Sequence, residues 1–291
     1  QTFTLSNWNL LCHLTKKSKV YYVLLFIVIL VTLLMIFPFV WTIVMSFKTD
    51  NDIINAPLAL PKVWNFDNYV RALKTLNIFA MYKNTIIVVV TTQIVSLVIT
   101  FMSSFAICRM KFQNRKIKNL LYTYYLLGIS VPVYILLFPI YRINIRLGVL
   151  DTLWSLILPY IAITIPFNTL LFVGFMKGFP KELEEAAIID GCDLIHLCIR
   201  VVVPILKPVI ATVTIFNVIY NWNEFPFAVT YISSSANYTI SLATSMFKGA
   251  YSRDYSAMIA AAVLIMIPQL IFYALLQKQI IAGMTEGAVK A

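Results

Sequence analysis

The sequence predicts an all-α membrane protein with six transmembrane helices. Of its 291 residues, 60% are hydrophobic and only 12% are charged, about half the charged share of roughly 25% in soluble domains. The mean hydropathy is +0.85. The apolar residues form long uninterrupted blocks, whereas a soluble helix carries a narrow apolar stripe. Together these features are typical of a chain that crosses a bilayer several times.

Each predicted span is an apolar block long enough to cross a bilayer, which takes about 20 helical residues. Six blocks qualify: 20–45, 84–108, 119–141, 152–174, 208–231 and 258–280. Prolines interrupt several of them. Proline is tolerated in a membrane helix where neighbouring helices or a cavity satisfy the freed backbone groups. We therefore expect an irregular bundle around an internal space, with 20–282 as the transmembrane domain.

The Lys and Arg residues predict the orientation of the chain. With residues 1–19 as a cytosolic N-terminal segment, most of the 23 basic residues face the cytosol, as the positive-inside rule requires. The loop 109–118 is the most basic, whereas Arg142 and Arg146 fall on the outer side and oppose this orientation. Both termini are then cytosolic. The net charge of +11 is thus read as a topology signal, and no nucleic-acid partner is predicted.

One outer segment, 46–83, contains the stretch FDNYVRALKTLNIFA. Its apolar residues Tyr69, Ala72, Leu73, Leu76 and Ala80 share one helical face. The sequence predicts an amphipathic helix on the outer surface. That helix is either a structural support or a docking surface for a soluble partner.

A polar insert at about 176–207 interrupts the apolar pattern between the fourth and fifth blocks. It predicts two short helices joined at Gly191, with Pro180 in the first turn of the first helix. Three glutamates favour the positive end of that helix. Asp193 is expected to cap the second helix, whose predicted apolar face is Leu194, Leu197, Cys198 and Val201. Because helices lying on anionic lipid are usually basic, we expect this cytosolic helix-turn-helix to bind a protein.

Within the insert, EAAIIDGCDLIHLCIRVVVP resembles the EAA loop of ABC importer permeases, E-A-A-x3-G-x9-I-x-L-P. The matching positions are Glu185, Ala186, Ala187, Gly191 and Pro204. Val201 and Val203 stand where Ile and Leu are usual. The stretch NWNEF and the ending AGMTEGAVKA also resemble carbohydrate importer permeases of the maltose type. The likeness covers essentially the whole chain.

The resemblance implies a permease subunit of the bacterial inner membrane that takes up a sugar delivered by an extracytoplasmic binding protein. It also implies a second permease subunit and two cytosolic ATPase subunits that bind ATP and Mg²⁺ and dock on the EAA helix. The chain itself has no G-x-x-x-x-G-K-[ST] phosphate loop, so we expect no ATPase activity and no cofactor of its own.

The resemblance further implies that the tail, 283–291, reaches between the ATPases, with Gly283, Thr285, Gly287 and Lys290 as contact residues. Gly283 and Gly287 are expected to permit sharp turns of the backbone.

Asn221, Asn223 and Glu224 fall within the fifth predicted span and are candidates for a substrate path. Intramembrane acids usually face a cavity or a partner. The alternative for Glu224 is a buried hydrogen-bonding group that holds the span near Pro226. Cys192, His196 and Cys198 cluster in the insert, but without a fourth ligand they predict no zinc site.

Other function classes stay open at this stage. Glycerol-phosphate importers use similar permeases, and the sequence does not identify the transported solute. An ion-coupled secondary transporter is less favoured because Glu224 is the one clear intramembrane charge. Motifs of an intramembrane enzyme, such as H-E-x-x-H or G-x-S-x-G, do not occur.

Overall fold

In the computed structural model, residues 19–178, 180–247 and 254–288 are described, and within them all regular secondary structure is helical. The long helices are α2 (Lys19–Met45), α5 (Ile78–Arg109), α8 (Trp154–Lys177), α12 (Lys207–Asn223) and α14 (Tyr255–Ala288). The shorter helices before residue 150 are α3 (Asp50–Asn55), α4 (Asp67–Thr75), α6 (Arg115–Leu127), η1 (Gly128–Ser130), η2 (Val133–Leu136) and α7 (Leu137–Leu147). Those after it are α9 (Glu182–Ile189), α10 (Leu194–His196), η3 (Leu197–Val202), α11 (Val203–Ile205), α13 (Pro226–Tyr231), η4 (Ser235–Asn237) and η5 (Ile240–Phe247).

Four helical segments are long and apolar enough to cross a membrane: Tyr21–Met45, Ile78–Arg109, Trp154–Lys177 and Tyr255–Leu275. Two sharply bent helix pairs raise the number to six if each pair is one span. The prediction of an all-helical membrane protein is confirmed, with four to six spans among the described residues.

The third predicted block, 119–141, is a bent pair. Its two arms, Arg115–Ser130 and Val133–Leu147, meet at 92°. Val131 between them is extended, as expected for a residue before a proline, because the proline ring disfavours the helical conformation there. At the start of this bend Gly128 lies against Pro166 of α8, where an added Cβ would meet the Pro166 Cγ at 2.5 Å.

The fifth predicted block, 208–231, is not one helix. α12 ends at Asn223, Glu224 is extended, and the separate helix α13 begins at Pro226. Proline has no N–H to continue the ladder of α12, but it suits the first position of a new helix. At its other end, α12 meets the segment Leu194–Ile205 at 74°.

The chain divides into two compact units. The first comprises residues up to Ala72 together with Arg253–Val263. Within it the Lys48 side chain is fully buried and donates to the carbonyls of Ala56 and Pro57 at 2.9 and 3.0 Å. Arg71 pairs with Asp254 at 2.7 Å. Backbone carbonyls thus pair the buried Lys48 charge, and a carboxylate pairs the partly exposed Arg71.

The amphipathic helix expected in 46–83 is shorter than predicted. α4 ends at Thr75 and Ala80 belongs to α5. The buried face of α4 carries Ala72 and the polar Asn68, whereas Leu73 is exposed. The Asn68 amide donates to the carbonyls of Ser46 and Lys48, both at 2.8 Å, which explains why a polar side chain is buried there.

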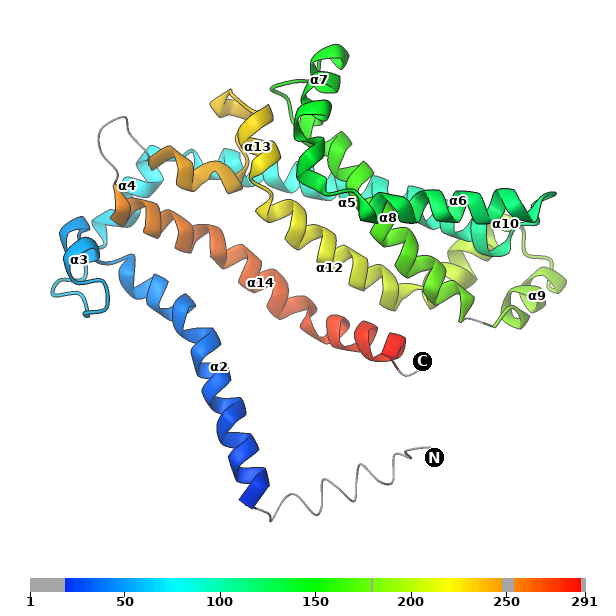
Figure 1. Ribbon diagram of the computed structural model, residues 1–291, viewed down its shortest axis with the longest axis horizontal. Helices are drawn as coiled ribbons and strands as arrows, with labels where there is room; N and C mark the ends of the chain where they lie inside the picture. The colour runs from blue at the N-terminus through cyan, green and yellow to red at the C-terminus, as the bar shows by residue number, and fades with distance from the viewer. Residues whose placement is uncertain (1–18, 179, 248–253, 289–291) are drawn as a thin grey trace. The chain divides into compact units, whose positions relative to one another are not determined.

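The second unit comprises Leu73–Ser252 and the rest of α14 from Leu264. α5, α8 and α12 pack against one another, and α6 lies along α8 (Figure 1). One core cluster joins these helices to the polar insert: Phe105, Phe172, Met176, Leu197, Val202, Leu206, Val209 and Val213. The insert is thus continuous with the packed interior of the spans.

Candidate functional site: the helical insert between α8 and α12

The first helix of the insert, α9, has acidic residues in its first turn. Glu182, Glu184 and Glu185 all lie there, where the unpaired backbone N–H groups favour negative charge. The predicted clustering of carboxylates at this end is confirmed. The prediction that Pro180 lies in the first turn is wrong, because Pro180 precedes the N-cap, Lys181, and is outside the helix.

The end of α9 is closed by a left-handed glycine. Gly191 has a φ of +85°. Its N–H bonds to the Ile188 carbonyl, and the Cys192 N–H reaches back to the Ala187 carbonyl, both at 3.0 Å. These two bonds define a Schellman motif. The predicted helix end at Gly191 is confirmed.

Asp193 caps the second helix as predicted. Its side chain accepts the backbone N–H of His196 at 2.7 Å. This hydrogen bond favours the charged carboxylate and lowers the pKa of Asp193. The turn between the two short helices is therefore defined by the C-cap at Gly191 and the N-cap at Asp193. These caps set the direction of α9 relative to the helix that follows.

The second helix contains a π-helical segment, η3. Leu197 and Val202 are buried five residues apart in it, the spacing that i→i+5 hydrogen bonds place on one face. The predicted apolar face, drawn with α-helical spacing, was partly wrong: Leu194 is exposed, while Cys198 and Val201 pack against the core. Pro204 follows the π segment in α11 and is exposed.

A buried ion pair connects the insert to a long helix. The Arg109 Nε, at the end of α5, lies 2.6 Å from the Glu184 Oε1, and both side chains are only 8% exposed. Sequence reasoning missed this pair. The available signal was that Glu184 and Glu185 are neighbours on a helix, so they point in different directions and need different partners.

Apart from buried Glu184 and half-buried Ala187, the residues of α9 are exposed. Glu185 and Ala186 are exposed, and so are Ile188 and Ile189, at 57% and 85%. An exposed apolar surface of this kind beside carboxylates is typical of a protein contact. Of the residues matching the EAA pattern, Glu185, Ala186 and Ala187 thus lie together on α9, Gly191 ends it, and Pro204 lies further along the second helix.

Glu224 lies at the break between α12 and α13 and is 4% exposed. Its carboxylate accepts the Tyr160 hydroxyl at 2.6 Å and the backbone N–H groups of Phe227 and Ala228 at 2.9 and 3.2 Å. These are the contacts of a hydrogen-bonding group that holds the start of α13 and attaches it to α8. Three donors occupy the two carboxylate oxygens.

The two asparagines near Glu224 differ from each other. Asn223 is exposed and links helices, because its side chain accepts from Gln269 of α14 at 2.7 Å. Asn221 is buried, and neither its amide nitrogen nor its oxygen has a hydrogen-bond partner among the described residues. The three candidate residues therefore lie close in sequence, and Asn221 alone among them keeps an unused polar group.

The C-terminal candidates are largely undescribed. The backbone of Gly283, Thr285 and Gly287 lies in α14, which continues as a helix to Ala288. The backbone is helical at both glycines, and a glycine within a helix costs about 1 kcal/mol relative to alanine. Lys290 lies outside the described residues. Within the described ranges, no three His, Cys, Asp or Glu residues come together as a metal site.

These features define a polytopic helical membrane protein with a capped helix-turn-helix between α8 and α12. Residues 100–286 match the family described as "Binding-protein-dependent transport system inner membrane component". The chain belongs to this family, and it is a multi-pass inner-membrane permease component of an ABC importer.

Curated relatives align along nearly the whole chain. It is 36% identical to a putative ABC transporter permease of a Caldicellulosiruptor strain, with 94% of this chain and 98% of the relative covered. It is 34% identical to a multiple sugar-binding transport system permease of Streptococcus mutans, over 94% and 99% of the two chains. The trehalose/maltose permease of Thermococcus litoralis is 32% identical, over 90% and 94%.

A solved structure shares the fold. A chain in the crystal structure of a bacterial ABC transporter involved in alginate import superposes with a TM-score of 0.72, at 20% identity, covering 96% of this chain and 99% of that one. The sequence-based recognition of a carbohydrate-type ABC permease is confirmed by these comparisons.

Proposed function

We propose that the chain moves a sugar across the inner membrane by alternating access, together with a second permease subunit, two ATPase subunits and an extracytoplasmic binding protein. Support for a sugar comes from relatives whose names specify trehalose and maltose, diacetylchitobiose or multiple sugars. In this proposal the bent pair Arg115–Ser130 and Val133–Leu147 is one span, and α12 is the span that follows the cytosolic insert. Both termini are cytosolic, and ATP and Mg²⁺ bind to the ATPases.

The observation that carries the proposal is that α9 has one carboxylate buried against α5 while most of its other residues are exposed. Glu184 is buried against Arg109, while Glu185, Ala186 and the two isoleucines are exposed. An ATPase that binds the outer face would move α9, and the buried pair would pass that displacement to α5. The core contacts of Leu197 and Val202 would pass it to α8 and α12.

Of the three candidate residues Asn221, Asn223 and Glu224, Asn221 is the best supported for a substrate path. A buried amide without hydrogen-bond partners costs a few kcal/mol. A sugar hydroxyl or a water that pairs with the Asn221 amide during transport would offset this cost. Glu224 and Asn223 would shape this path indirectly, since their hydrogen bonds are already used within the protein. The tail residues Gly283, Thr285, Gly287 and Lys290 would contact the ATPases.

The test is uptake into proteoliposomes that contain the complete complex, with ATP enclosed and the binding protein outside. Labelled mono-, di- and oligosaccharides and glycerol phosphate would be compared. We expect uptake of a sugar that requires ATP and the binding protein and is unchanged by a protonophore. Uptake of glycerol phosphate in place of every sugar, or uptake driven by an ion gradient without ATP, would contradict the proposal.

A further inference from the structure

A basic pocket lies where α5 ends, α6 begins and α8 ends. It has a volume of about 620 Å³, within the range of roughly 300–1,000 Å³ usual for ligand sites. Its lining includes Lys111, Arg115, Lys118 and Lys177, and no acidic residue among the described part of the chain. The pocket belongs neither to the exposed face of α9 nor to the helix break at Glu224.

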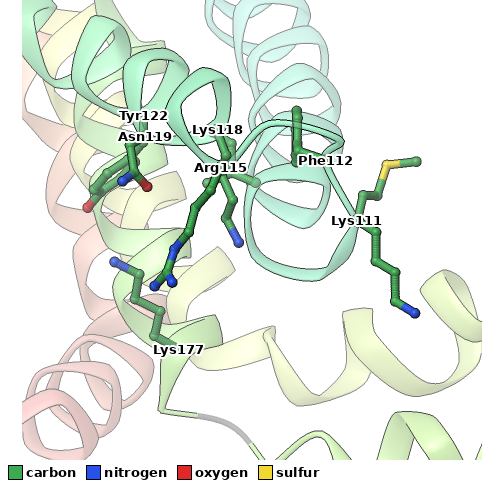
Figure 2. A pocket seen from close by; sticks show the side chains of 9 residues that line it. Lys111, Phe112, Arg115, Lys118, Asn119, Tyr122 and Lys177 are labelled. Carbon is green, nitrogen blue, oxygen red and sulfur yellow. The ribbon is translucent and has the colours of Figure 1, made fainter.

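The cations in this pocket are not neutralised by the protein. Figure 2 shows the charged ends of Arg115 and Lys177 pointing toward one another, while Lys111 extends in another direction. Over the described residues, Arg115, Lys118 and Lys177 have no carboxylate within ion-pair distance. Lys177 instead lies over the Tyr122 ring, 4.8 Å from its centre. Like charges held together in this way favour a bound anion.

The helix that carries two of these residues adds to the positive potential. Arg115 and Lys118 lie in the first turn of α6, which contains no acidic residue. The N-terminus of a helix already has a partial positive charge and favours anions. The end of α8 offsets this in part, since Lys177 lies in its last turn, where a cation is favoured.

The other residues that line the pocket are apolar or uncharged polar, a combination suited to an amphiphilic ligand. Ile107, Met110 and Phe112 contribute apolar surface, and Asn119 and Tyr122 contribute polar groups. The pocket also lies at one end of both α5 and α8, which are long and apolar enough to cross the membrane. Lipid phosphates lie at that depth of the bilayer, and basic pockets between spans are suited to them.

We propose that this pocket binds the phosphate of an anionic glycerophospholipid. Arg115, Lys118 and Lys177 would contact the phosphate, and the apolar residues would contact the glycerol region. A free inorganic anion would use the charges but leave the apolar lining unused. The inference goes beyond the proposed function, because it concerns a lipid bound to the permease and holds whichever solute is transported.

The test is native mass spectrometry of the complete complex titrated with phosphatidylglycerol and, separately, with phosphatidylcholine. In the variant Arg115→Gln/Lys118→Gln, affinity for phosphatidylglycerol should fall about 25-fold, or about fivefold for each charge removed. The matched control, Lys116→Gln/Lys207→Gln, removes the same charge from two exposed residues outside the pocket and should bind like the wild type. The charge-preserving variant Arg115→Lys/Lys118→Arg should bind phosphatidylglycerol and melt like the wild type.

Three results would overturn the proposal. The first is equal loss of phosphatidylglycerol in the pocket variant and in the control, or no loss in either. The second is inorganic phosphate binding as tightly as the lipid, which would make the ligand a free anion. The third is a pocket variant that keeps the lipid but loses the ATPase subunits, which would make the pocket a protein contact.

Discussion

Arg109 and Glu184 form a buried ion pair that joins the last turn of α5 to the first turn of α9, with 2.6 Å between Nε and Oε1. The residues are 75 positions apart in the chain. The pair attaches an exposed helix to α5, one of the longest helices in the described residues. In the proposed function, a displacement of α9 by the ATPase would be transmitted to α5 through this pair. Neighbouring Glu185 on the same helix remains exposed.

Replacing Glu184 should destabilise the subunit. Glu184→Gln leaves the buried Arg109 cation without its carboxylate, and breaking a buried pair costs about 3–5 kcal/mol. We expect a lower melting temperature of the purified complex and less folded subunit in the membrane. The control is Glu182→Gln on the same turn, which is exposed and should melt like the wild type. If both variants melt alike, the pair has no structural importance.

Replacing Gly191 should affect coupling through the backbone alone. Gly191 and Gly148 both have positive φ, +85° and +68°, and an added Cβ would meet nothing within 4 Å at either position. Alanine at each should therefore cost a similar amount, roughly 1–2 kcal/mol. We expect only Gly191→Ala, in the insert, to reduce uptake relative to ATP hydrolysis. Equal uptake per ATP in the two variants would argue against a role for the insert in coupling.

Glu224→Gln should lower stability but preserve ATP-driven uptake. A glutamine side chain offers one acceptor oxygen, so at least one of the three hydrogen bonds to Tyr160, Phe227 and Ala228 is lost, at about 1–3 kcal/mol. Tyr160→Phe, which removes one of these bonds, provides a comparison. Uptake that collapses in Glu224→Gln despite a folded complex, or that requires a proton gradient, would show that the carboxylate itself takes part in transport.

The long helices and the caps of the insert could be predicted from sequence because their causes are local. Apolar length identified α2, α5, α8 and α14, a glycine after a helical stretch identified the end of α9, and Asp193 identified the next cap. Each of these signals lies within a few residues of the feature that it specifies.

The features that sequence reasoning missed depend on contacts between distant segments. Arg109 and Glu184 meet only after α5 and the insert have packed together. A hydrogen-bonding role for Glu224 near Pro226 was among the predicted alternatives, but its partner Tyr160, which lies 64 positions earlier, was not predicted. The π segment η3 shifted the apolar spacing of the insert, and an assumed α-helical period cannot reveal such a shift.

Removing the C-terminal tail should weaken communication with the ATPases. If residues 283–291 contact the ATPase pair, their deletion lowers substrate-stimulated ATP hydrolysis in the purified complex while the subunit stays in the membrane. The variant Lys290→Gln keeps the length of the tail and removes one charge. Comparing it with the deletion distinguishes the effect of the charge from the effect of losing the segment. Full stimulation in the truncated complex would mean that the tail is a loose end, which is the usual state of chain termini.

The most direct test of the account is the ratio of solute uptake to ATP hydrolysis in Glu185→Ala. The account predicts a folded complex with wild-type melting temperature, since Glu185 is exposed and Glu184 keeps its partner. It also predicts that uptake per ATP falls strongly, because in this account Glu185 pairs with a basic residue of the ATPase. Removing one partner of a buried interfacial ion pair costs about 2–5 kcal/mol. Glu182→Ala serves as the control on the same turn. Wild-type uptake per ATP in Glu185→Ala, at equal expression, would contradict the claim that the outer face of α9 receives the ATPase.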